Sequence, residues 1–94
     1  MKKIQKTVQQ ISDQKGYSQQ SLEQTFLLLT EEVGELAKTV RKSIGMKIGS
    51  HSKHQHVGEE VADVLYVFVD ICNRLGIDME KEFNNKLKII RDRS

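Results

Sequence analysis

The chain has 94 residues, 15 basic and 13 acidic side chains, and no proline. This length corresponds to a single domain, residues 1–94, and the absence of proline favours long uninterrupted helices. The net charge of +2 and the aromatic content of 5% argue against a surface built for a nucleic-acid polymer. The longest apolar-rich stretch, residues 61–75, is too short and too charged to span a membrane.

The compartment is indicated by cysteine usage and by the N-terminus. Cys72 is the single cysteine, so no internal disulfide can form and we expect a reducing, cytoplasmic compartment. The N-terminus is charged but lacks the apolar segment of a signal peptide. Because Cys72 lies in an apolar run, we interpret it as a small core residue.

Apolar periodicity predicts helices in the first half of the chain. The first helix, of about 12 residues, is indicated by a repeat at i, i+4 and i+7, formed by Ile4, Val8 and Ile11. Gly16 ends this helix. A second helix follows from about residue 22 to residue 44, where Ser21 and Gln24 fit a capping box at its start.

The second half begins with a predicted loop. Residues 45–58 contain three glycines and two serines without an apolar period. A third helix is predicted for residues 59–75, ended by Gly76, and it is apolar on more than one side, which favours a second subunit as a neighbour. Asp78 caps a fourth helix with the apolar stripe Met79, Phe83, Leu87 and Ile90. The prediction is an all-α, four-helix bundle.

Two acidic stretches lie inside these apolar helices, EEVGE at 31–35 and EEVAD at 59–63. Helix positions three apart share a face, which pairs Glu32 with Glu35, and Glu60 with Asp63. Packed together, these carboxylates would repel one another unless a cation lay between them. All-oxygen ligands favour Mg²⁺, with Mn²⁺ as a substitute, and Mg²⁺ usually keeps open positions for substrate phosphates. A single such pair would be interpreted as solvated charges or as partners for nearby lysines.

The paired motifs carry a resemblance. EEVGE, a loop and then EEVADVL resemble the MazG-like all-α nucleoside triphosphate pyrophosphohydrolases, whose motif is Glu-Glu-x-x-Glu, a spacer and Glu-x-x-Asp. The resemblance covers roughly residues 20–93. It implies a homodimer or homotetramer with Mg²⁺ at each site. It also implies hydrolysis of a (d)NTP to a (d)NMP and pyrophosphate, a reaction of nucleotide-pool housekeeping.

The resemblance also implies roles for individual residues. Four carboxylates would bind the metal: Glu32, Glu35, Glu60 and Asp63. Glu31 would be a further ligand or would orient the attacking water, which makes Glu31 and Glu35 the candidate catalytic residues. Asp70 falls where many relatives place a polar residue that faces the nucleotide. Lys38 is a candidate phosphate contact, with ion pairing along its own helix as the alternative reading.

The last helix departs from the family pattern. Relatives commonly carry a Lys-x-x-x-Asn or Lys-Asn element there, whereas this chain has Lys86 but Ile89 and Ile90 near the later positions. This departure leaves base recognition by the last helix open. Two alternative functions follow: phosphoribosyl-ATP pyrophosphohydrolase of the same fold, and a non-catalytic helical adaptor that retains the acidic motif.

Three histidines in the predicted loop form His-x-x-His-x-His: His51, His54 and His56. We interpret them as part of a solvated, variable loop. The alternatives are an adventitious transition-metal site and a loop that closes on phosphates. Lys47 and Lys53 favour the second alternative, because a zinc site usually has four fixed ligands.

Overall fold

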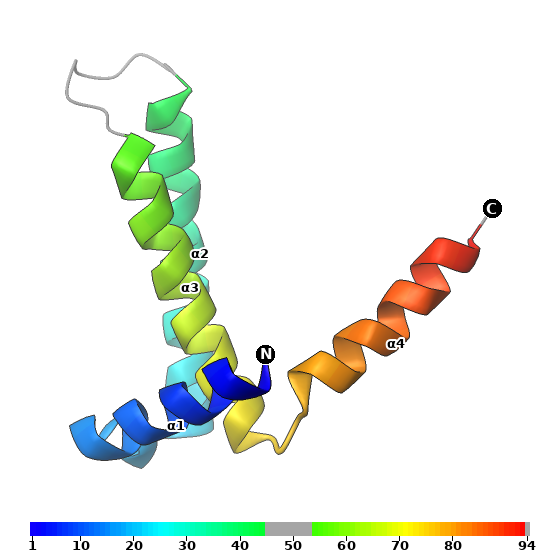
Figure 1. Cartoon of the computed structure of the whole chain (residues 1–94). Coiled ribbons are helices and arrows are strands. Elements are labelled where there is room, and N and C mark those ends of the chain that lie inside the picture. Colours follow the sequence, from blue (N-terminus) through cyan, green and yellow to red (C-terminus); the bar gives the residue numbers. More distant parts are fainter. Residues whose placement is uncertain (45–53, 94) are drawn as a thin grey trace.

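A computed structural model describes residues 1–44 and 54–93 of the chain. This part contains one short 3₁₀ helix, η1 (Tyr17–Gln19), and four α-helices: α1 (Lys2–Lys15), α2 (Leu22–Ser43), α3 (His54–Arg74) and α4 (Met79–Asp92). The described residues form no strand, which confirms the all-α prediction and the number of helices. Figure 1 shows α2 and α3 side by side as a hairpin, α1 lying across its base, and α4 pointing away.

The helix boundaries follow the predicted local signals. Gly16 ends α1 with a φ of 77°, and Gly76 follows α3 with a φ of 69°, a left-handed conformation that suits glycine. At the start of α2 the Ser21 hydroxyl accepts from the Gln24 backbone N–H at 3.0 Å, and the Gln24 side chain accepts from the Ser21 N–H at 3.1 Å. The Asp78 side chain caps α4. These four predictions are confirmed.

The start of α3 was predicted wrongly, because the helix begins at His54 and not at residue 59. Glycine in a helix interior costs only about 1 kcal/mol. Val57 in the extra turn is half-buried, so packing outweighs the cost of Gly58. The remainder of the predicted loop, with His51, lies outside the described residues, and so do the side chains of His54 and His56.

The core is a single cluster that joins α1, α3 and the first residue of α4: Val8, Val69, Cys72 and Met79. Tyr66 packs against it, and its hydroxyl shares a hydrogen bond of 2.8 Å with the fully buried hydroxyl of Ser12 in α1. This bond satisfies a polar group that would otherwise destabilise the core. The prediction that Cys72 is a core residue is confirmed.

Gln5 fixes the turn between α3 and α4 against α1. Its side-chain N–H groups donate to the Asn73 side chain at 2.9 Å and to the Ile77 carbonyl at 2.8 Å. Its side-chain oxygen accepts from the Met79 backbone N–H at 3.0 Å, and Asn73 donates back to the Gln5 carbonyl at 2.9 Å. The direction in which α4 leaves the molecule therefore depends on a polar contact with α1.

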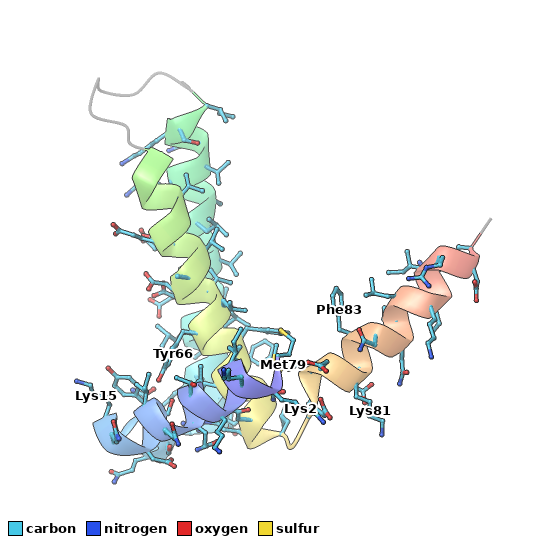
Figure 2. The ribbon with its side chains drawn as sticks, viewed as in Figure 1. Lys2, Lys15, Tyr66, Met79, Lys81 and Phe83 are labelled. Atoms are coloured by element: carbon cyan, nitrogen blue, oxygen red, sulfur yellow. The ribbon has the colours of Figure 1, made fainter. Side chains whose placement is uncertain are left out.

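Beyond Met79, α4 extends away from the other helices (Figures 1 and 2). Phe83, Leu87 and Ile90 of its predicted apolar stripe are 57%, 36% and 49% exposed. The four described helices of one chain are thus not closed into a bundle, which corrects that part of the prediction: the apolar stripe of α4 stays exposed, and Phe83 is separated from Phe68 of α3 by an open groove. In the described ranges, no helix has the length and apolar character needed to cross a bilayer.

Candidate metal and substrate site

Three of the predicted carboxylates come together on the hairpin. Glu32 lies in the middle of α2, while Glu60 and Asp63 lie one turn apart on α3. One oxygen of each side chain lies within 4.8 Å of the other two. Glu32 and Glu60 are half-buried and Asp63 is exposed, so the cluster sits at the edge of the α2–α3 contact.

The electrostatics of this cluster are unfavourable in the protein alone. Burial raises the pKa of Glu32, and the negative charges of neighbouring carboxylates raise it further: Asp63, Glu60, Glu35 and Glu31. Among the described residues, the ion pairs join the N-terminal amine to Glu80 and Arg74 to Asp70. Neither pair reaches the cluster, so no described side chain forms an ion pair with it.

The cluster fits a hard divalent cation. Mg²⁺ binds oxygen at about 2.1 Å, so ligand oxygens on opposite sides of the ion are about 4.2 Å apart. Oxygens already within 4.8 Å therefore need only small side-chain rotations. A bound cation would also remove the repulsion that raises the pKa of Glu32.

The other predicted residues of the acidic motif are exposed. Glu35 lies one turn beyond Glu32, close enough to raise its pKa, but its carboxylate is outside the three-residue group. Glu31 contributes the smallest of the charge effects on Glu32. Lys38 follows on α2, is exposed, and makes no ion pair within the described residues. A Cβ added at Gly34 would meet nothing within 4 Å among the described residues, so no described helix of the same chain approaches Gly34 closely.

Asp70 is separated from the cluster and has a partner. It lies seven residues beyond Asp63, about 10.5 Å along the helix axis and on nearly the same face. Its carboxylate is buried and forms an ion pair with the Arg74 Nε at 3.3 Å. The Nε–H does not point at the carboxylate, so this contact is an ion pair without a hydrogen bond. Arg74 also donates to the main-chain oxygens of Tyr17, at 2.6 Å, and Gln20. This guanidinium ties the η1 segment to α3.

A cavity of about 300 Å³ opens beside Asp70. Its lining comes from η1, α2 and α3, and includes Tyr17, Thr25, Leu28, Tyr66, Val67 and Asp70. Leu28 and Glu32 are four residues apart on α2, and Asp63 and Val67 are four apart on α3, so the cavity and the acidic cluster lie along one face of the hairpin. Figure 2 places Tyr66 near the base of the hairpin, where α1 crosses.

Carboxylates that converge from the two helices of a hairpin form a class of site that suits a divalent cation and phosphates. The family model for the MazG nucleotide pyrophosphohydrolase domain matches residues 20–94. The chain therefore belongs to the MazG nucleotide pyrophosphohydrolase family, as its resemblance predicted.

Two further comparisons add context. The chain is 41% identical over 54 residues to the "Uncharacterized protein YpjD" of Bacillus subtilis (strain 168), which corresponds to 56% of this chain and 49% of that protein. The chain thus spans about half the length of this relative. No solved structure matches significantly.

Sequence reasoning missed the cavity and two of its walls. Tyr17 and Tyr66 are 49 residues apart in the sequence and lie in different elements, so no local pattern links them. Their rings meet edge to face, with centroids 6.4 Å apart. The Arg74 contacts with main-chain oxygens of η1 also have no signature in the sequence, because any residue can supply a carbonyl.

Proposed function

We propose that this chain is a Mg²⁺-dependent nucleoside triphosphate pyrophosphohydrolase. It hydrolyses (d)NTP to (d)NMP and pyrophosphate and serves nucleotide-pool housekeeping in the cytoplasm. The observation that carries the proposal is the convergence of Glu32, Glu60 and Asp63 within the residues that the MazG family model matches. The unpaired Cys72, buried in the core, is consistent with a reducing compartment.

The acidic cluster holds the cation in this mechanism. Glu32, Glu60 and Asp63 would supply three oxygens, and Glu35, one turn from Glu32, would supply a fourth. When bound, Mg²⁺ neutralises phosphate charge and lowers the pKa of a coordinated water. Mn²⁺ would substitute, since it accepts the same oxygen ligands.

The remaining exposed side chains of α2 act on water and substrate. A carboxylate oxygen of Glu31 or Glu35 orients the attacking water and accepts its proton, as general bases do when they lie within hydrogen-bond reach. The water attacks the α-phosphorus, the bond to the bridging oxygen breaks, and pyrophosphate leaves. Lys38, two turns beyond Glu31, contacts the phosphates, and Asp70 contacts the nucleoside. Positioning and charge stabilisation are the main demands of phosphoryl transfer.

The test is a product assay. The purified chain is incubated with Mg²⁺ and each NTP or dNTP in turn, in ¹⁸O-labelled water. The products are separated, and their masses are measured by mass spectrometry. Attack at the α-phosphorus places the label in the monophosphate and none in the pyrophosphate. Release of orthophosphate, or label in pyrophosphate alone, contradicts the proposal.

We also propose that the chain works as a homodimer or homotetramer. An apolar groove of about 710 Å³ lies between α3 and α4, lined by Leu65 and Phe68 on one side and Phe83 on the other. Phe68 and Phe83 are 45% and 57% exposed, and Phe26 and Val33 of α2 are also exposed. Contiguous apolar surface of this kind is typical of subunit contacts. The occupant that we propose is a helix of a second copy.

Light scattering coupled to gel filtration tests this assembly. The wild-type chain should have a mass of two or four protomers. Phe83→Lys should shift it to one, because the charge enters the apolar groove. Asn84→Lys places the same charge at the next exposed position of α4 and should leave the mass unchanged. A monomeric wild type, or an unaltered mass for Phe83→Lys, contradicts the assembly.

A further inference from the structure

The described part of the chain leaves α4 without a packing partner along most of its length. The helix has 14 residues, and residues 80–93 are all exposed. An isolated helix of this length is only marginally stable in water, so its stability depends on an apolar contact. Figure 2 shows Phe83 on the side of α4 that is turned towards the hairpin, whereas Lys81 points away from it.

The charges that border the apolar stripe of α4 have opposite signs at its two ends. Glu80 and Arg91 are eleven residues apart, about three helical turns, so they lie on one flank of the stripe. Glu82 and Arg93 have the same spacing and lie on the other flank, with Lys86 one turn from Glu82, which offsets its charge. On each flank an acid lies near the start of the helix and a base near its end.

This distribution is complementary to an antiparallel copy of the same helix. Across a two-fold axis between antiparallel helices, each flank meets the same flank of the second copy, reversed in direction. Glu80 then lies opposite Arg91 of the second copy, and Glu82 lies opposite its Arg93, so every acid faces a base. A parallel arrangement would place acids beside acids and bases beside bases, which is unfavourable.

The apolar residues fit the same register. The two charged pairs are centred within one residue of the midpoint between Phe83 and Ile90. Phe83 of one copy therefore meets Ile90 of the other, with Leu87 near the two-fold axis. The groove of about 710 Å³ beside Phe83 is also lined by Phe68 of α3, so a second α4 in this position would cover both aromatic rings.

We propose that α4 pairs antiparallel with α4 of a second copy, and that contacts of Glu80 with Arg91 and of Glu82 with Arg93 set direction and register. This inference rests on the proposed assembly and extends it to the helix and the charges that select the partner. Gln5 bonds the start of α4 to α1, so the stripe is presented in a fixed direction. One oxygen of Glu80 pairs with the N-terminal amine at 3.2 Å, and the other can receive Arg91 of the second copy.

Charge reversal tests the pairing, with the dissociation constant of the assembly measured by analytical ultracentrifugation at low salt. Arg91→Glu should raise this constant roughly tenfold, because an acid then faces Glu80 of the other copy. Lys88→Glu makes the same charge change on the face of α4 away from the stripe and should leave the constant unchanged. Glu80→Arg combined with Arg91→Glu should restore wild-type affinity. An unchanged constant for Arg91→Glu, or no recovery in the double variant, overturns the pairing.

Cross-linking with a short bismaleimide tests the direction. A mixture of Glu80→Cys and Arg91→Cys chains should give a covalent dimer of the two variants. Glu80→Cys alone should not, because its two copies would lie about 16.5 Å apart along the helix axis, the rise of eleven residues. The wild-type chain, whose Cys72 is buried, is the control and should stay unlinked. Absence of the mixed dimer, or linkage of Glu80→Cys to itself, overturns the antiparallel arrangement.

The two proposals fail differently. A monomeric wild type removes the assembly and this pairing together. An assembly whose dissociation constant does not respond to the charge variants removes only the pairing through α4. Hydrolysis of nucleotides is measured on the same preparations and bears on the activity alone, while circular dichroism checks the helical content of each variant.

Discussion

Two groups of acids on α3 differ in whether a cationic side chain pairs with them, and that difference separates a place for an external cation from a contact that also holds the fold together. Glu60 and Asp63 face Glu32 across the hairpin and have no cationic partner among the described residues. Asp70, two turns further along, is more deeply buried but pairs with Arg74. A paired acid is part of the fold and shapes the cavity. Acids that gather without a partner, and whose charges raise the pKa of Glu32, indicate a place for an external cation.

The largest effect should follow from breaking the unpaired group. Asp63→Asn removes a charged ligand while keeping the side-chain shape, so hydrolysis should fall by at least about 100-fold. The assay is pyrophosphate release at saturating Mg²⁺.

The matched control is Glu59→Gln, which removes one negative charge from an exposed position next to Glu60. It should retain most of the activity. If both variants lose activity equally, net charge matters and the geometry of the cluster does not.

The second effect concerns the paired acid. Arg74→Met should lower the free energy of unfolding by about 2–4 kcal/mol, because it leaves Asp70 buried without its partner and releases η1. Urea unfolding followed by circular dichroism measures it. Arg41→Met, at an exposed site on α2, should change stability by less than about 0.5 kcal/mol.

The double variant Asp70→Leu with Arg74→Met sharpens this test. Replacing both partners removes the unpaired buried charge, so it should recover part of the lost stability. A double variant less stable than Arg74→Met alone would show that the charge pair is not what Arg74 contributes.

The smallest effect is on the metal-free cluster. The raised pKa of Glu32 means that the folded chain holds this proton more tightly than the unfolded chain, so stability declines as pH rises from the ordinary value of 4.5 through the folded pKa. Glu32→Gln should remove that decline. It should stabilise the chelator-treated protein at neutral pH by roughly 0.2–0.5 kcal/mol for each repulsion removed.

Melting curves from acid to neutral pH with a chelator measure this effect. The variant should melt above the wild type at neutral pH and converge with it in acid. A variant that melts lower at neutral pH would mean that Glu32 already has a stabilising partner.

Local signals in the sequence predicted the helix boundaries well. The Ser21 capping box, the left-handed glycines Gly16 and Gly76, and the Asp78 cap each depend on residues within a few positions of one another. The start of α3 was missed because Gly58 is unfavourable in a helix and the half-burial of Val57 just before it depends on packing that no local pattern shows. Helix propensity alone places the start of such a helix too late.

The features that could not be predicted from the sequence depend on contacts between residues far apart in the chain. The pairing of motif acids across the hairpin was predicted from helix periodicity, and three of the four carboxylates converge while Glu35 lies outside the group. The Gln5–Asn73 contact spans 68 residues and directs α4 away from the hairpin. Arg74 of α3 holds Tyr17 at the wall of the cavity by donating a hydrogen bond to its carbonyl. Neither contact leaves a periodic or spaced pattern in the chain.

The most direct test of the account is the melting temperature of the chain as a function of Mg²⁺. A cation held by Glu32, Glu60 and Asp63 binds the folded state and must stabilise it, by about 2.7 kcal/mol at one hundred times its dissociation constant. We predict a saturable rise for the wild type and for Glu59→Gln, and none for Asp63→Asn. If the melting temperature of the wild type does not change on addition of Mg²⁺ or Mn²⁺, the result would contradict the metal site and favour a non-catalytic adaptor.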